Sequence, residues 1–206
     1  MRSDDRSSEP LLKGQLFVVR LEYLQRMHGT QGLRQTLECL PRVERERLRS
    51  LERNAWYPFR TLVQLDRAIA AVTAPDDPSI YERLGEASSH YRTEWLGRHA
   101  PLVSVHGFLA RSAEEHRRFH NFGRASYRRT AFTEGEMSLS DYPEVDEVFC
   151  RSATGYFRGV LQALTNAPAV VEEHRCQCRG DDACLFRLSR VGPDASRAVE
   201  PPSPRR

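Results

Sequence analysis

Apolar residues recur at the three- and four-residue spacing of amphipathic helices through the first half of the chain. This spacing predicts helices over 16–29, 33–40, 62–72 and 77–97, and an Arg- and Glu-rich stretch predicts a short helix over 42–50. Gly29 and Pro41 end the first two helices, and Trp56-Tyr57-Pro58 marks a turn. Pro101 starts a further helix that runs to about His116.

After Gly123 the pattern changes to the two-residue alternation of strands. Residues 125–130 and 137–141 predict one hairpin with its turn at 134–136. A helix is predicted from about 144 to 165, followed by a second hairpin with strands at 170–178 and 185–190. This order predicts an α+β fold, in which N-terminal helices pack on a small antiparallel sheet made of two hairpins separated by a long helix.

The chain has 206 residues, which suits a single domain. We expect that domain over 13–190, between a disordered leader (1–12) and a disordered tail (191–206) rich in Pro, Ser and Arg. No apolar run is long enough for a membrane span and the first residues are polar, so we expect a cytoplasmic protein without a membrane partner. The net charge is only +3 and acidic residues interrupt the arginine runs, which disfavours a nucleic-acid partner.

Cysteine gives the most specific chemical signal. Three of the five cysteines, Cys176, Cys178 and Cys184, fall within nine residues, and an odd number in a reducing compartment argues against disulfides. Cys176 and Cys184 lie on the two arms of the second predicted hairpin, and Cys150 lies in the helix before it. Three thiolates and one further ligand would form a closed, structural zinc site. The alternative is that the three cysteines are buried as small apolar residues.

The same segment resembles a known family. Cys150, Gly155-Tyr156, Gly159, Glu173-x-x-Cys176 and Gly180-Asp181-x-x-Cys184 are similar to the end of 4-vinyl-reductase-like sensor domains. The start, from Lys13 to Gly29, resembles the opening of haem–nitric-oxide-binding domains of the same superfamily. That superfamily also includes the sensing half of bacterial aromatic-responsive activators and TRAPP vesicle-tethering subunits.

The resemblance implies a particular ligand set for the zinc. By position in the aromatic-responsive sensors, the ligands would be Cys150, Glu173, Cys176 and Cys184. On a regular strand, however, residues 173 and 176 face opposite sides. A bulge or a strand end between them would bring both to the metal. Without one, His174 or Cys178 is the better fourth ligand.

The resemblance also implies a function. We expect a sensor or ligand-binding module with a pocket for a small apolar or aromatic molecule between helices and sheet, lined by His106, Tyr127, Phe132 and Tyr156. A nucleophile elbow, a P-loop and a dinucleotide glycine pattern are absent from the sequence, so we do not expect an enzyme. A signal would pass to a partner protein through a homodimer or a hetero-complex.

Three alternatives remain at the level of sequence. A haem gas sensor would use His106 as its axial ligand, although the Tyr-x-Ser-x-Arg propionate clamp of that family is absent. His116 and His120, at i and i+4, could share a metal on one helix face, but no third ligand stands nearby. A protein-interaction scaffold of the same fold would bind no ligand, as the vesicle-tethering relatives suggest.

Overall fold

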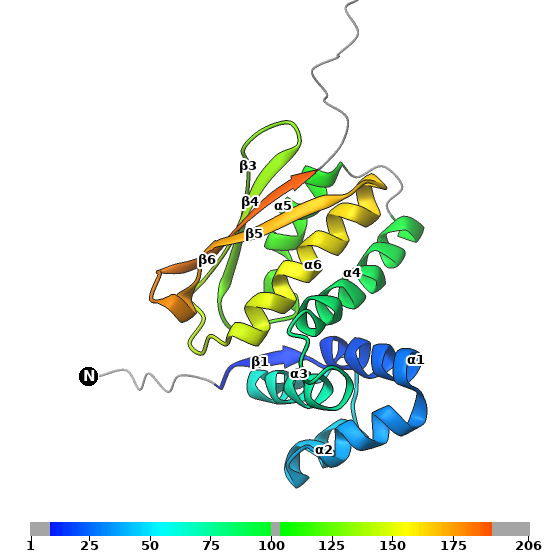
Figure 1. The fold of residues 1–206 in the computed structure, drawn as a ribbon. Coiled ribbons are helices and arrows are strands. Elements are labelled where there is room, and N and C mark those ends of the chain that lie inside the picture. Colours follow the sequence, from blue (N-terminus) through cyan, green and yellow to red (C-terminus); the bar gives the residue numbers. More distant parts are fainter. Residues whose placement is uncertain (1–8, 100–103, 191–206) are drawn as a thin grey trace, which may run out of the picture.

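The structure is a computed structural model that describes residues 9–99 and 104–190, with the backbone alone considered for 91–99. The chain forms two groups of elements (Figure 1). The first comprises β1 (Leu11–Lys13), α1 (Gln15–Glu38), α2 (Arg42–Arg49), β2 (Trp56–Pro58), α3 (Phe59–Thr73) and α4 (Ile80–His99). The second comprises α5 (Val105–Glu114), η1 (His116–Arg118), β3 (Arg124–Arg129), β4 (Glu134–Ser140), α6 (Glu147–Thr165), β5 (Ala169–Arg175), η2 (Gln177–Arg179) and β6 (Ala183–Arg190).

The N-terminal helices follow the predicted periodicity closely. α1 kinks at Gly29, whose φ of 65° and ψ of −171° are not helical, and then continues to Glu38. A positive φ is costly for a residue with a Cβ, so glycine is the residue that permits this kink. The predicted helix end at Gly29 is therefore a break between two helical segments. The short helix expected over 42–50 is α2.

Two short strands differ from the predictions. Trp56–Pro58, expected to be a turn, is strand β2 and pairs antiparallel with β1. β1 begins at Leu11, inside the expected leader 1–12, and the Leu12 side chain is fully buried. Segments of three residues contain too little alternation to predict a strand from sequence.

The main sheet has the strand order β3-β4-β6-β5, and all neighbours are antiparallel. Alternate residues of β4 and β6 are buried against α5 and α6, including Met137, Leu139, Phe186 and Leu188. The predicted α+β fold, with two hairpins separated by a long helix, is confirmed. Figure 1 shows α6 lying between this sheet and α4.

The turn of the first hairpin lies at 130–133, before the predicted 134–136. Glu134-Gly135-Glu136 is part of β4, where Gly135 pairs with Arg129 on one side and Leu188 on the other. The Tyr127 ring covers Gly135 so closely that a Cβ would overlap it. Glycine therefore accommodates a cross-strand ring at this position and does not form the turn.

Close helix packing joins the two groups of elements. α4 and α6 lie side by side, and glycines stand at their contact (Figure 1). A Cβ at Gly85 would overlap the Ser152 carbonyl oxygen, and one at Gly155 would overlap the Glu82 carbonyl oxygen. The backbones approach to a distance that other residues do not allow.

A buried ion pair connects four helices. Arg20 on α1 contacts Asp66 on α3, with 3.2 Å between Nε and Oδ1, and both side chains are almost fully buried. The same guanidinium donates to the Ser88 hydroxyl on α4 and, at 2.6 Å, to the Ser152 hydroxyl on α6. A buried charge needs such partners because leaving it unpaired costs several kcal/mol.

Candidate functional site

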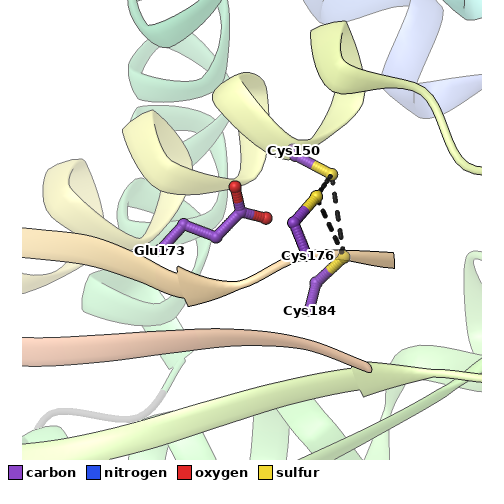
Figure 2. Close-up of side chains that lie close together, drawn as sticks. All are labelled: Cys150, Glu173, Cys176 and Cys184. Atoms are coloured by element: carbon purple, nitrogen blue, oxygen red, sulfur yellow. Dashed lines mark hydrogen bonds between the residues drawn. The ribbon is translucent and has the colours of Figure 1, made fainter. Parts of the chain in front are cut away.

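The three cysteines singled out by their spacing meet in the fold. Cys150, Cys176 and Cys184 are each at most 3% exposed. Their sulfur atoms are separated by 3.5 Å (176 to 150), 3.7 Å (150 to 184) and 3.8 Å (184 to 176), as Figure 2 shows. In a tetrahedral zinc site with Zn–S bonds of about 2.3 Å, neighbouring sulfurs are about 3.8 Å apart. The sulfur triangle therefore has nearly the size that one zinc ion requires.

The local structure explains how each cysteine reaches the cluster. Cys150 lies in the first turn of α6, which the Asp146 side chain caps by accepting from the Val148 N–H at 2.9 Å. Cys176 precedes η2, and its N–H donates to Asp181 Oδ2 at 2.8 Å. Gly180, with a φ of 91°, then reverses the chain toward β6.

Cys184 is the second residue of β6 and faces the helices. Its sulfur accepts a hydrogen bond from the Gln177 N–H at 3.3 Å. Such N–H···S contacts stabilise negative charge on a thiolate and hold the sulfur in place around a metal.

Glu173 completes the group. Its carboxylate and the three sulfurs supply ligand atoms that all lie within 4.8 Å of one another. The register between β5 and β6 shifts between Glu173 and Arg175, which is the irregularity that the opposite-face argument requires. Figure 2 shows the Glu173 carboxylate turned toward the sulfurs.

The two oxygens of Glu173 differ in their surroundings. Oε2 contacts the Arg179 guanidinium at 3.3 Å, whereas Oε1 is buried without a hydrogen-bond partner. A buried carboxylate oxygen without a partner is costly, and a cation at the centre of the cluster would supply one. The donor set therefore fits a metal ion.

The alternative fourth ligands lie outside the cluster. The His174 ring is about half exposed and stands 3.6 Å from the Glu172 carboxylate. Cys178 is exposed on η2, and Cys39 is exposed at the end of α1. In the part of the chain that the structure describes, the group of metal-ligating side chains consists of Cys150, Glu173, Cys176 and Cys184.

Protonation of the thiols is unequal. A hydrogen bond with Cys184, together with burial, raises the pKa of Cys150 far above its ordinary value, and burial raises the pKa of Cys176 to about 12. The hydrogen bond from Cys150 lowers the pKa of Cys184 to about 7. A metal ion would displace the protons that remain, which makes metal affinity depend on pH.

Three soft thiolates and one carboxylate favour zinc over hard cations such as magnesium or calcium. Four protein ligands leave no open position for water or substrate, which is typical of a structural site and not of a catalytic one. The arrangement can therefore connect β5, β6 and α6 through one ion.

A cavity of about 510 Å³ lies on the other side of α6. Its lining comes from α1, α4, α5, η1, the main sheet and α6. The apolar part includes Leu16, Val19, Met137, Leu139, Phe149 and Phe157. Phe149 and Ser152 of α6 line the cavity while Cys150, between them, faces the metal cluster. One helix thus forms part of both sites.

The structure brings one of the four expected pocket residues to this cavity. Tyr156 lines it. His106, Tyr127 and Phe132 meet elsewhere, where His106 Nδ1 lies 2.6 Å from the Tyr127 hydroxyl and Nε2 lies 2.8 Å from the Phe132 carbonyl oxygen. The Phe132 side chain is 69% exposed at the hairpin turn. Here the structure differs from the prediction, because the hairpin turn is displaced and its aromatic residues point away from α6.

The same contacts bear on the haem alternative. Both ring nitrogens of His106 are hydrogen-bonded, and this side chain is not part of the lining of the cavity. The imidazole proposed as the axial ligand therefore does not fit that role.

His116 and His120 line the cavity and stack on each other, with ring centroids 4.1 Å apart. His116 Nε2 donates to the Phe122 carbonyl at 3.2 Å, and His120 Nδ1 donates to the His116 carbonyl at 3.2 Å. Burial lowers the pKa of His116 to about 4 and that of His120 to about 3. Both rings are therefore neutral near pH 7, and they stack instead of chelating an ion between them.

Sequence reasoning missed the N-terminal wall of the cavity. Lys13, Gln15, Leu16, Val19 and Arg20 belong to it although they precede the sheet by more than a hundred residues. The backbone N–H of Lys13 donates to the Phe119 carbonyl at 2.9 Å, which holds the start of the chain against η1. The buried positions of α1 predicted a core face, but nothing in them showed that this face borders a hollow.

Comparison with known proteins supports both halves of this description. Residues 131–190 match the 4-vinyl-reductase (4VR) domain family. The chain carries a 4VR domain in an H-NOX-like fold. The fold assignment rests on solved structures of H-NOX proteins, which are similar over most of the chain at low identity.

An H-NOX protein from S. oneidensis in the Fe(II)NO state aligns with a TM-score of 0.69 at 14% identity, covering 88% of this chain and 100% of its own. An oxygen-binding H-NOX domain related to soluble guanylate cyclases aligns with a TM-score of 0.65 at 13% identity, covering 94% and 100%. An uncharacterized protein of Methanocaldococcus jannaschii is 37% identical over 46 residues, which are 22% of this chain and 25% of that protein. This match spans about a quarter of the relative's length.

The 4VR match begins after α5 and before Cys150, and it also contains Glu173, Cys176 and Cys184. It therefore includes the whole metal cluster. The resemblance to 4-vinyl-reductase-like and haem–nitric-oxide-binding domains is confirmed at the level of domain and fold. None of the helices in the described ranges is both long and apolar enough to cross a membrane.

Proposed function

We propose that this protein is a non-enzymatic, cytoplasmic sensor or ligand-binding module that binds a small apolar or aromatic molecule. A structural zinc, held by Cys150, Glu173, Cys176 and Cys184, supports the wall of the binding site. The 4VR domain and the H-NOX-like fold support a role of this class. The bound state would be read by a partner protein or by a second copy of this chain.

The single observation that carries the proposal is the cavity between the N-terminal helices and the sheet. Its volume of about 510 Å³ lies within the range of small-molecule sites, and most of its lining is apolar. Closely packed interiors contain few voids of this size, so the hollow is a feature that the scaffold reading does not explain.

The test combines metal analysis with ligand-dependent melting. Purified protein that has not met a chelator should contain about one zinc per chain, measured by plasma mass spectrometry. A panel of phenols and other aromatic compounds is then screened by thermal denaturation. A ligand at about 100 times its dissociation constant should stabilise the fold by about 2.7 kcal/mol.

A matched pair of variants locates the binding site. Ala153 lines the cavity on α6, whereas Ala163 is exposed on the same helix. Ala153→Leu should reduce the cavity and abolish the shift, and Ala163→Leu should leave it unchanged. Zinc-replete protein that shows no shift with any compound would contradict ligand binding and favour the interaction-scaffold alternative.

A further inference from the structure

The cavity is chemically asymmetric. Its floor is formed by apolar side chains from α6 and the sheet, including Met137, Leu139 and Phe157. One end is basic, with Lys13, Arg53 and Arg118 from β1, the segment before β2, and η1. A ligand that fills the whole site would meet these two environments at opposite ends of its own structure.

Backbone contacts hold the basic end together. Lys13 N–H donates to the Phe119 carbonyl next to Arg118, and Gln15 N–H donates to the Arg53 carbonyl, both at 2.9 Å. Three segments that are distant in sequence therefore supply cations to one place. Local structure holds these side chains near one another before any ligand arrives.

Lys13 has no carboxylate partner among the described residues. Its ammonium group donates to the Asn54 carbonyl at 2.6 Å and stands 4.0 Å above the Trp56 ring. Arg118 shares a single carboxylate, that of Glu115, with Arg111. Positive charge is therefore in excess at this end of the cavity.

Two buried polar groups of the lining have unused hydrogen-bonding capacity. Gln15 Oε1 accepts from Arg53 at 2.9 Å, but Gln15 Nε2 is buried with no partner. The Ser112 hydroxyl on α5 is buried without a partner as well. An amide N–H₂ can only donate, so Gln15 calls for an acceptor in the cavity.

The other basic side chains of the cavity lining do not compete for a negative charge. Arg20 is paired with Asp66, and the stacked rings of His116 and His120 are neutral near pH 7. An anion is therefore stabilised at the basic end, and the inner part accepts apolar groups.

We propose that the ligand is an organic acid with an apolar body, whose carboxylate is bound by Lys13 and Gln15 while its body fills the space between α6 and the sheet. This inference rests on the proposed function and specifies the chemical class of the ligand. A carboxylate supplies the acceptor that Gln15 Nε2 lacks and the counter-charge that Lys13 lacks.

The test uses two probes with the same ring system. 2-Naphthoate carries the carboxylate, and 2-naphthylmethanol replaces it with a neutral hydroxymethyl group. Isothermal titration should show that the zinc-replete protein binds the acid at least about tenfold more tightly, because hydrogen bonds to charged groups are the stronger ones. Raising the salt concentration should weaken binding of the acid and leave the alcohol unaffected.

Variants identify the groups responsible. Lys13→Gln and Gln15→Leu should each lower affinity for the acid about tenfold and leave the alcohol unchanged. Arg42→Gln is the matched control, since it removes one positive charge from α2, at an exposed site outside the cavity. Zinc content and the melting temperature without ligand show whether each variant is folded.

The outcomes separate the inference from the proposed function. Equal affinity for acid and alcohol, or acid binding that Lys13→Gln and Gln15→Leu leave intact, would overturn the inference while ligand binding stands. Binding of neither probe, nor of any compound in the aromatic panel, would contradict both.

Discussion

A single irregular residue pair decides the composition of the metal cluster. On a regular strand Glu173 would point away from Cys176, and sequence alone left Glu173, His174 and Cys178 open as the fourth ligand. The register shift between Glu173 and Arg175 turns the Glu173 carboxylate inward, while His174 and Cys178 are exposed. Bulges depend on how two strands pair, so the sequence of one strand did not reveal this one.

The ligand assignment is tested by single substitutions. Cys150→Ser should lower the zinc content and reduce the free energy of unfolding by more than the roughly 1 kcal/mol of an average point change, because it removes a structural metal ligand. Glu173→Gln should release zinc to a chelator at a lower chelator concentration. Cys178→Ser is the control and should behave as the unchanged protein, measured by zinc content and denaturant titration.

The opposite pattern would refute the assignment. If Cys178→Ser removes zinc while Glu173→Gln retains it, the strand is regular in solution and the fourth ligand is Cys178.

Two buried imidazoles should make stability sensitive to acid. The folded-state pKa values of about 4 for His116 and about 3 for His120 lie below the usual value of about 6.5. The unfolded chain therefore binds more protons between these values. Stability should fall as pH decreases below about 6.5, by up to about 1.4 kcal/mol per pH unit for each ring, and the loss should be complete near pH 3.

Urea denaturation at several pH values between about 7 and about 4.5 measures this slope. His120→Leu should reduce it because one titrating ring is removed. Zinc-free protein serves as the control, since loss of zinc in acid adds its own pH dependence in the metal-bound form. A slope that His120→Leu leaves unchanged in zinc-free protein would show that this ring does not contribute.

At the scale of helices and strands, glycines set the contact between α4 and α6. Gly155→Ala should lower the free energy of unfolding by about 1–3 kcal/mol, because the new methyl group meets the backbone carbonyl of Glu82. At Gly159 a Cβ would instead meet the Ser89 hydroxyl. Gly159→Ala should therefore be milder, and combining it with Ser89→Ala should recover part of the loss.

Chemical denaturation of these variants is the measurement. An equal cost at both glycines, with no recovery in the double variant, would mean that the helices separate and that the close contact is not maintained.

Long periodic elements could be predicted from the sequence, and short or irregular ones could not. The apolar spacing of 62–72 and the alternation of 185–190 identify α3 and β6, because their burial repeats over several turns or residues. Trp56–Pro58 is a strand because β1 lies beside it, which a pattern of three residues cannot show. The hollow between α1 and α6 depends on how whole elements pack, so its lining was largely missed.

At the scale of the whole molecule, α6 carries one metal ligand and part of the cavity wall. Tyr142 extends this relation, because it lines the cavity and its pKa is raised by burial and then by the nearby thiols Cys184 and Cys150. Holding Cys150 in place should therefore also hold Phe149 and Ser152 in position for a ligand.

Zinc removal should for this reason weaken ligand binding. We expect the dissociation constant of 2-naphthoate, measured by titration calorimetry, to rise by about five- to tenfold in zinc-free protein, which is a modest coupling between sites. Because such coupling is reciprocal, the bound acid should slow the transfer of zinc to a chelator dye. Equal affinity with and without zinc would show that the two sites are independent.

The strand order has a consequence for biosynthesis. β5 pairs with β6 alone, and β6 lies between β4 and β5 although it is the last strand of the domain to be made. During translation, at about 5–20 residues per second, β5 and the second edge of β4 must wait without partners until β6 leaves the ribosome. The same strand delivers Cys184, so the sheet and the metal cluster become complete in one late event. A cell short of zinc should therefore accumulate nascent chains whose N-terminal helices are folded and whose strand edges are exposed to aggregation.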